Sequence, residues 1–138
     1  MKKIFLSVIS LIVVLNFVSC KESSTDVEVP KVDYNPNITS NVEVFKYNLT
    51  AKSVSITDQQ TIVIISNSVK IDLIVSEWQG GTVEVLVTTK TGQNIFERRI
   101  QADAVQGASV NLPALLDKVK FTLGSFTGKV NFQIATVN

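Results

Sequence analysis

Apolar and polar residues alternate along most of the chain after residue 41, and this period of two is typical of half-buried β-strands. In the clearest runs, Val, Ile, Leu or Phe occupies every second position; these runs are residues 69–75, 83–87, 119–123 and 130–134. The breaks between runs do not leave room for the helices of an alternating strand–helix fold. The pattern therefore predicts an all-β domain over residues 41–138.

Short segments rich in turn-forming residues separate the alternating runs. They are residues 66–68, 79–81, 89–93 and 124–128. Thr91-Gly92 lies between two runs and predicts a hairpin, with Gly92 at a positive φ. Strands recur about every 8–13 residues, a spacing typical of a sandwich of two sheets. We expect one small antiparallel β-sandwich, immunoglobulin-like or jelly-roll-like.

The first 19 residues have the parts of a secretory signal peptide. Lys2 and Lys3 supply a positive start, residues 4–18 are almost all apolar, and the small Ser19 precedes Cys20. The apolar run of about 15 residues is shorter than the ~20 that a membrane-spanning helix needs. We expect residues 1–19 to be removed; a retained membrane-spanning segment is the alternative.

The residues Phe17-Val18-Ser19-Cys20 resemble the lipobox of bacterial lipoproteins, with Phe17 in place of the more usual Leu. The resemblance implies that the Cys20 thiol carries a diacylglycerol through a thioether and that the new amino terminus receives a further acyl chain. Two or more chains give stable membrane anchoring, whereas one is marginal. Since Cys20 is the only cysteine, an internal disulfide is excluded.

Two further features resemble surface lipoproteins of the Bacteroidota. Lys21-Glu22 directly follows the cysteine, as in their export signals, and residues 81–134 look like the small β-sandwich ectodomains of bacterial lipoproteins. The resemblance implies a lipid-anchored protein of the bacterial cell envelope, at the outer membrane or the cell surface. It carries no binding-site residues with it.

Residues 20–40 predict a lipidated cysteine followed by a flexible tether. The segment contains Ser, Thr, Asp, Asn, Pro30 and Pro36 and has no helical period; proline favours extended conformations. The alternative is that Val27, Val29 and Val32 form a first strand at the edge of the domain.

Composition excludes several classes of function. The chain has no histidine and one cysteine, which removes Ser-His-Asp and Cys-His catalysis and histidine or cysteine metal sites beyond a single ligand. A formal net charge of +1 gives no electrostatic footprint for nucleic acid. We expect no enzyme, no cofactor, no metal and no nucleic-acid partner.

Three residues are the candidates for ligand contact: Trp78, Arg98 and Phe126. Trp78 precedes Gly80-Gly81 and could stack on a sugar ring, although a single Trp in a sandwich more often fills the core. Arg98 and Arg99 are adjacent, so we expect them to point to opposite faces of a strand. Phe126 lies in a Gly-bounded loop and either contacts a partner or tucks beneath the hairpin.

Three functions remain open. The leading hypothesis is a non-enzymatic binding or accessory module for a glycan or protein ligand. The second is a structural envelope component that assembles through a sheet edge. The third is a glycoside hydrolase using carboxylates 5–10 Å apart, with Asp72 and Glu84 on neighbouring strands as the candidate pair.

Overall fold

The computed structural model describes residues 34–137, which form six strands and no helix. The strands are β1 (Asn37–Ser40), β2 (Val44–Thr61), β3 (Ser68–Thr89), β4 (Asn94–Ile100), β5 (Ala104–Asn111) and β6 (Leu116–Thr136). Every pairing is antiparallel. Within this part of the chain there is accordingly no helix that could cross a membrane. The expected signal peptide and Cys20 lie outside the described residues.

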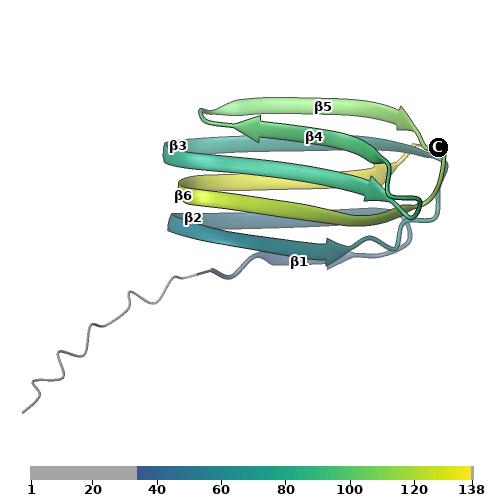
Figure 1. The fold of residues 1–138 in the computed structure, drawn as a ribbon, viewed down its shortest axis with the longest axis horizontal. Helices are drawn as coiled ribbons and strands as arrows, with labels where there is room; N and C mark the ends of the chain where they lie inside the picture. Colours follow the sequence, from purple (N-terminus) through teal and green to yellow (C-terminus); the bar gives the residue numbers. More distant parts are fainter. Residues whose placement is uncertain (1–33, 138) are drawn as a thin grey trace, which may run out of the picture.

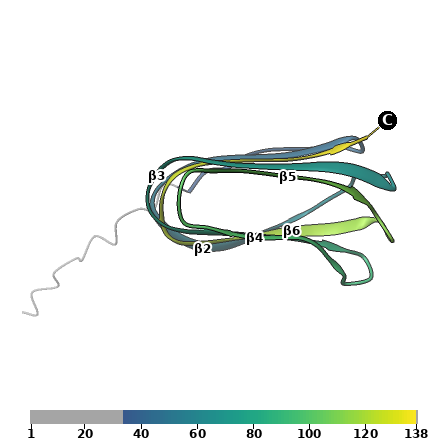
Figure 2. The same cartoon turned by 90° about the horizontal axis from the view of Figure 1, so that it is seen from above.

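The three long strands bend sharply near their middles, so each contributes to two layers (Figures 1 and 2). The β5 layer contains β1, residues 44–51, 128–136 and 68–76, and β5. The β4 layer contains residues 54–61, 116–124 and 82–89, and β4. The layers are continuous at the corner end, and they separate at the open end, where β6 finishes (Figure 2).

This strand order decides between the two sandwich types that the sequence predicts. One layer runs β2–β6–β3–β5 and the other runs β2–β6–β3–β4, with the same three strands supplying neighbours in both. An immunoglobulin sandwich divides its strands between separate sheets, whereas a jelly roll wraps paired strands over both. The all-β sandwich prediction is confirmed, and its jelly-roll form is the correct one.

The corners explain why the sequence suggested more and shorter strands. Residues 79–81 and 124–128 have turn chemistry, but they are places where β3 and β6 pass from one layer to the other. Positive φ angles gather there, at Gly80 (155°), Gly81 (81°) and Ser125 (49°). The hairpin prediction at Gly92 is confirmed, since its φ is 82°.

Aromatic side chains from both layers meet in the core. The Tyr47 ring stacks on Phe121 with centroids 3.9 Å apart, and Phe132 meets Phe121 edge-on at 5.3 Å. Tyr47 and Phe132 come from the β5 layer, and Phe121 comes from the β4 layer. These contacts join the two sheets across the interior, and each such pair adds about 0.5–1.5 kcal/mol beyond area burial.

The sandwich begins earlier than the sequence predicts. Residues 37–40, expected in the tether, form edge strand β1 against β2, and Tyr34 packs on the core. The boundary expected between residues 40 and 41 therefore moves to about residue 34. Short polar strands such as Asn-Ile-Thr-Ser lack a visible alternation, and their pairing depends on the neighbouring strand. The rest of the expected tether, residues 20–33, lies outside the described residues.

Candidate functional site

Trp78 lies at the corner of β3 and is half-buried against the core. Its indole Nε1 donates a hydrogen bond to the Gly81 carbonyl oxygen (3.2 Å), and its backbone N–H donates to the Asp103 carboxylate (2.8 Å). The ring is thus tied to the corner by its Nε1 and packs partly on the core. The position of Trp78 fits the core-filling role better than the sugar-stacking role.

Phe126 is not accessible for ligand contact. Its side chain is 0% exposed and belongs to the core, at the corner of β6. Each phenylalanine within residues 34–137 is at most 3% exposed, so aromatic stacking on the described sheet faces is not provided by phenylalanine.

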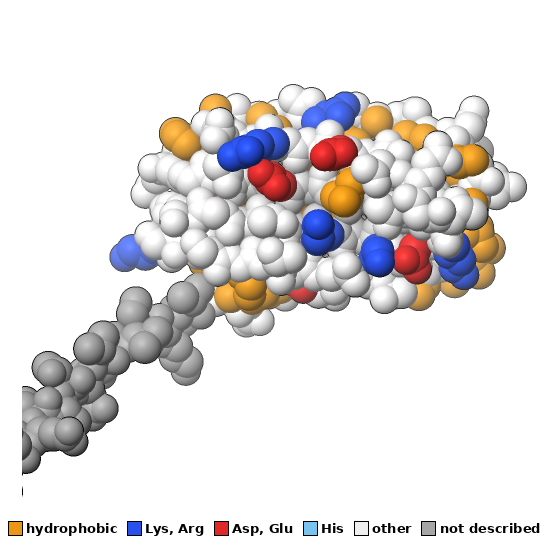
Figure 3. Space-filling model, viewed as in Figure 1, with side chains coloured by type: hydrophobic (Ala, Val, Ile, Leu, Met, Phe, Trp, Pro, Cys, Tyr) orange, Lys and Arg blue, Asp and Glu red, His pale blue; other side chains and the backbone are white. Residues whose placement is uncertain are grey.

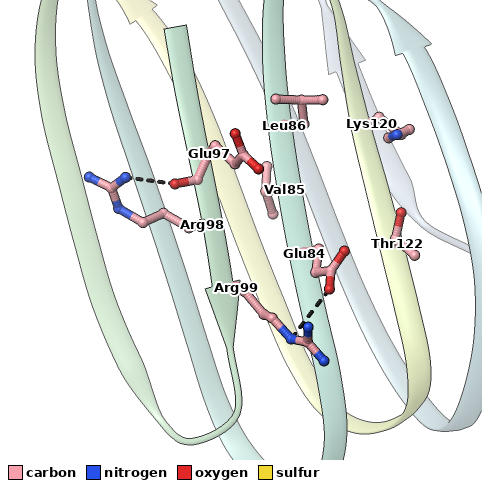
Figure 4. Close-up of a pocket in the computed structure, with 8 residues that line it drawn as sticks. All are labelled: Glu84, Val85, Leu86, Glu97, Arg98, Arg99, Lys120 and Thr122. Atoms are coloured by element: carbon pink, nitrogen blue, oxygen red, sulfur yellow. Dashed lines mark hydrogen bonds and ion pairs between the residues drawn. The ribbon is translucent and has the colours of Figure 1, made fainter. Parts of the chain in front are cut away.

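The two arginines diverge, as their adjacency predicts (Figure 4). Arg98 carries its guanidinium 4.9 Å from the centroid of the Phe96 ring and donates from Nη1 to the Glu97 carbonyl oxygen (2.6 Å). Arg99 points to the outer face of the β4 layer, with Nε 3.3 Å from Oε1 of Glu84. Arg98 therefore covers the edge of the aromatic core, and Arg99 belongs to the outer face.

A hollow of about 380 Å³ opens on that outer face, over β3, β4 and β6 (Figure 4). It is lined by Glu84, Val85, Leu86, Glu97, Arg98, Arg99, Lys120 and Thr122. Strand register places Lys120, Leu86 and Glu97 side by side in one row across the three strands. Thr122, Glu84 and Arg99 form the next row. Leu86 therefore forms an apolar floor between the Lys120 ammonium and the Glu97 carboxylate. The ion pair of Glu84 and Arg99 lies beside this row.

The β4 layer faces the viewer in Figure 3, where side chains of both charges lie among apolar ones. Within residues 34–137, Lys120 and Glu97 form no ion pair, whereas Glu84 and Arg99 hold one another. The hollow therefore offers one ammonium and one carboxylate that are not committed to another charged side chain. Sequence alternation could place these residues on an outer face, but only the register brings them together.

The prediction that Asp72 and Glu84 face each other from neighbouring strands is wrong. Asp72 and Glu84 lie on the same strand, β3, but on opposite sides of its corner, and both alternate with buried neighbours. Because each points outward from its own layer, the two carboxylates lie on opposite surfaces of the sandwich. Asp72 pairs instead with Lys70, 3.0 Å away. The carboxylate that does share a hollow with Glu84 is Glu97.

The outer face of the β5 layer holds a second hollow, of about 390 Å³. Asn37, Asn48 and Asn131 form a row across β1, β2 and β6 that continues to Ile74 and Val105. The side-chain amides can both donate and accept hydrogen bonds. This face is polar with an apolar margin, and its nearest carboxylate, Asp72, is already in an ion pair.

A partly buried phenol cluster lies between the layers beside β1, and the sequence alone does not predict it. The Tyr34 hydroxyl lies 2.7 Å from the Tyr47 hydroxyl and donates to the Asp58 carboxylate. Burial, together with the Asp58 contact, raises the pKa of Tyr34 well above its ordinary value, and burial raises the pKa of Tyr47 to about 12. These contacts fix the start of the domain to both layers.

The cluster predicts a loss of stability in alkali. In the unfolded chain both tyrosines release their protons near pH 10, whereas in the folded chain they hold them. Stability from the two phenols is therefore complete below pH 10 and is lost as the pH rises toward 12 and above. Tyr34→Phe should flatten this dependence, as measured by denaturant unfolding between pH 8 and pH 12. Because lysines also titrate there, the comparison with the parent chain is the control, and equal slopes would contradict the cluster.

No group of three or more metal-ligating side chains occurs among the described residues. No protein-family model matches the chain. No curated protein matches it.

Several solved structures are similar to the chain at low identity. A chain of the disulfide-linked pili of Bacillus endospore appendages is 14% identical, with a TM-score of 0.46, over 75% of this chain and 92% of that one. BiXyn10A CBM1 is 14% identical, with a TM-score of 0.40, over 76% and 91%. A mutant of a family 29 carbohydrate-binding module is 12% identical, with a TM-score of 0.37, over 75% and 80%.

Proposed function

We propose that the protein is a lipid-anchored, non-enzymatic binding module that holds a neutral glycan in the hollow of the β4 layer. The observation that carries this proposal is the row in which Leu86 lies between Lys120 and Glu97. A sugar ring has an apolar C–H face and a rim of hydroxyl groups. Leu86 would contact the face, while the ammonium donates to the hydroxyls and the carboxylate accepts from them.

The charges of the hollow favour a neutral ligand over a polyanion. Arg99 and Lys120 are matched by Glu84 and Glu97, so neither sign dominates. Arg98 is the fifth charged residue of the lining, but its guanidinium points away from the hollow (Figure 4). An open sheet face also suits an extended chain of sugars better than a reaction that must exclude water.

Removing either charged side of the row should weaken binding. Lys120→Ala and Glu97→Ala each delete a charged hydrogen-bonding group worth about 1.5–3 kcal/mol, so we expect a loss of affinity of about 10- to 100-fold. The purified full chain is first screened on an array of neutral oligosaccharides, and the variants are then compared by titration calorimetry on the best ligand.

Lys46→Ala is the matched control, because Lys46 lines the hollow on the opposite face. It should bind as the parent chain does. Failure of every neutral glycan, or equal affinity of all three variants, would overturn the proposal. If Lys46→Ala weakened binding and the other two variants did not, the site would lie on the β5 layer and the proposal would be overturned.

A further inference from the structure

The free edges of the two layers are protected to very different degrees. Exposed edge strands can pair with other chains, and proteins commonly block them with charges, prolines, bulges or short length. β4 carries Glu97, Arg98 and Arg99, and β1 has 4 residues. The edge formed by the second half of β2 carries Asp58, which Tyr34 covers.

β5 has none of these protections. Its eight residues, Ala-Val-Gln-Gly-Ala-Ser-Val-Asn, include no charge and no proline. Its register with β3 runs from Ser68–Asn111 to Val75–Ala104 without a bulge. Val105 is 77% exposed and forms an apolar patch with Ile74, which is 39% exposed. β5 is thus a regular, uncharged edge with apolar surface beside it.

The ladder shows which backbone groups of β5 have no strand partner among residues 34–137. The Leu112 N–H donates to the Asn67 carbonyl on the β3 side, at 2.7 Å. Since bonding direction alternates along an antiparallel strand, the even-numbered residues of β5 bond to β3. The N–H and C=O groups that point away from β3 belong to Val105, Gly107, Ser109 and Asn111.

We propose that β5 pairs with β5 of a second copy of this chain, antiparallel and about a two-fold axis. A second copy fits because an uncharged strand can lie against itself without bringing like charges together. With the axis at Ala108, Val105 lies opposite Asn111 of the second copy, and Gly107 lies opposite Ser109. Every outward backbone group of the strand then has a partner, and the β5 layers join into one sheet.

A single cysteine placed on the axis tests this arrangement. Ala108 would face Ala108 of the second copy in a pair that does not exchange hydrogen bonds, where Cα atoms lie about 4.5 Å apart, within the range of disulfides. In cells producing the full chain, Ala108→Cys should form a disulfide-linked dimer on mild oxidation, and the parent chain, which has Cys20 alone, should not. Ala104→Cys is the matched control, since it has the same side chain and phase but lies four residues from the axis and should not cross-link.

Proline at Ser109 separates pairing from folding. Ser109→Pro removes an outward N–H without touching the bonds to β3, as proline is tolerated at strand edges. In the Ala108→Cys background it should reduce cross-linking at least tenfold, whereas Ser109→Ala, which keeps the N–H, should not. A folded Ala108→Cys chain that stays monomeric, equal cross-linking by Ala104→Cys, or no effect of Ser109→Pro would each overturn the proposal. Glycan binding at the β4 layer is independent of these three outcomes.

Discussion

Gly81→Ala is expected to lower the free energy of unfolding by about 2–5 kcal/mol, through the φ penalty of an L-residue together with overpacking. The backbone of Gly81 has a φ of 81° at the corner of β3. A Cβ there would lie 2.4 Å from the carbonyl oxygens of Gly124 and Ser125 in the neighbouring corner of β6. These are backbone atoms that cannot rotate away, so the two corners must separate.

Gly92→Ala is a closely matched control for this prediction. Gly92 has a φ of 82°, but a Cβ added there meets nothing within 4 Å. Its cost should be only the conformational one, about 1–2 kcal/mol. Urea unfolding of the three chains measures both values. Equal destabilisation would show that the corner contact carries no energy and that φ alone explains the glycine.

Period-two alternation correctly predicted which side chains fill the core, because a half-buried strand must place its apolar residues on one side. Val83 and Val85 are buried as expected, and Glu84 between them points outward. The same signal could not show that residues 69–75 and 83–87 belong to one strand. Glycine and serine occur at hairpin turns and at corners alike, because both kinds of bend need unusual φ values.

This ambiguity explains the wrong carboxylate pair. When a strand passes through a corner, its outward residues before and after the corner lie on opposite surfaces of the molecule. The prediction that Asp72 and Glu84 face each other depends on their runs being neighbouring strands. The row of Lys120, Leu86 and Glu97 could not be predicted for a related reason: alternation gives the face of a residue but not the register between strands.

Tyr34 shows a different limit of sequence-based inference. A single aromatic residue between prolines and polar residues has no periodic signal, so its segment resembles a tether. Its position depends on the hydroxyl of Tyr47 and the carboxylate of Asp58, which come from different layers. Only the tertiary fold brings these groups together, and the domain consequently begins before the alternation does.

The position of Tyr34 also limits where a lipid on Cys20 could hold the sandwich. β1 runs from the corner side toward the open end, because Asn37 lies opposite Asn48 and Ser40 lies opposite Phe45. The chain therefore enters the sandwich from the corner side (Figure 1). From Cys20 to Tyr34 a chain can reach at most about 50 Å. An anchor at Cys20 would therefore keep the start of β1, at the corner end, within about 50 Å of the membrane.

Cys20→Ala is expected to abolish fatty-acid labelling and membrane retention of the anchored form completely. Alanine has no thiol to form the thioether, and Cys20 is the only cysteine of the chain. The measurement is metabolic labelling with a fatty acid, followed by membrane fractionation and surface proteolysis of intact cells. Ser19→Ala is the matched control, because it keeps a small residue before the cysteine and should be labelled as the parent chain is. A parent chain that carries no lipid and keeps its first 19 residues would contradict the anchor, while glycan binding by the sandwich would still be decided by Lys120 and Glu97.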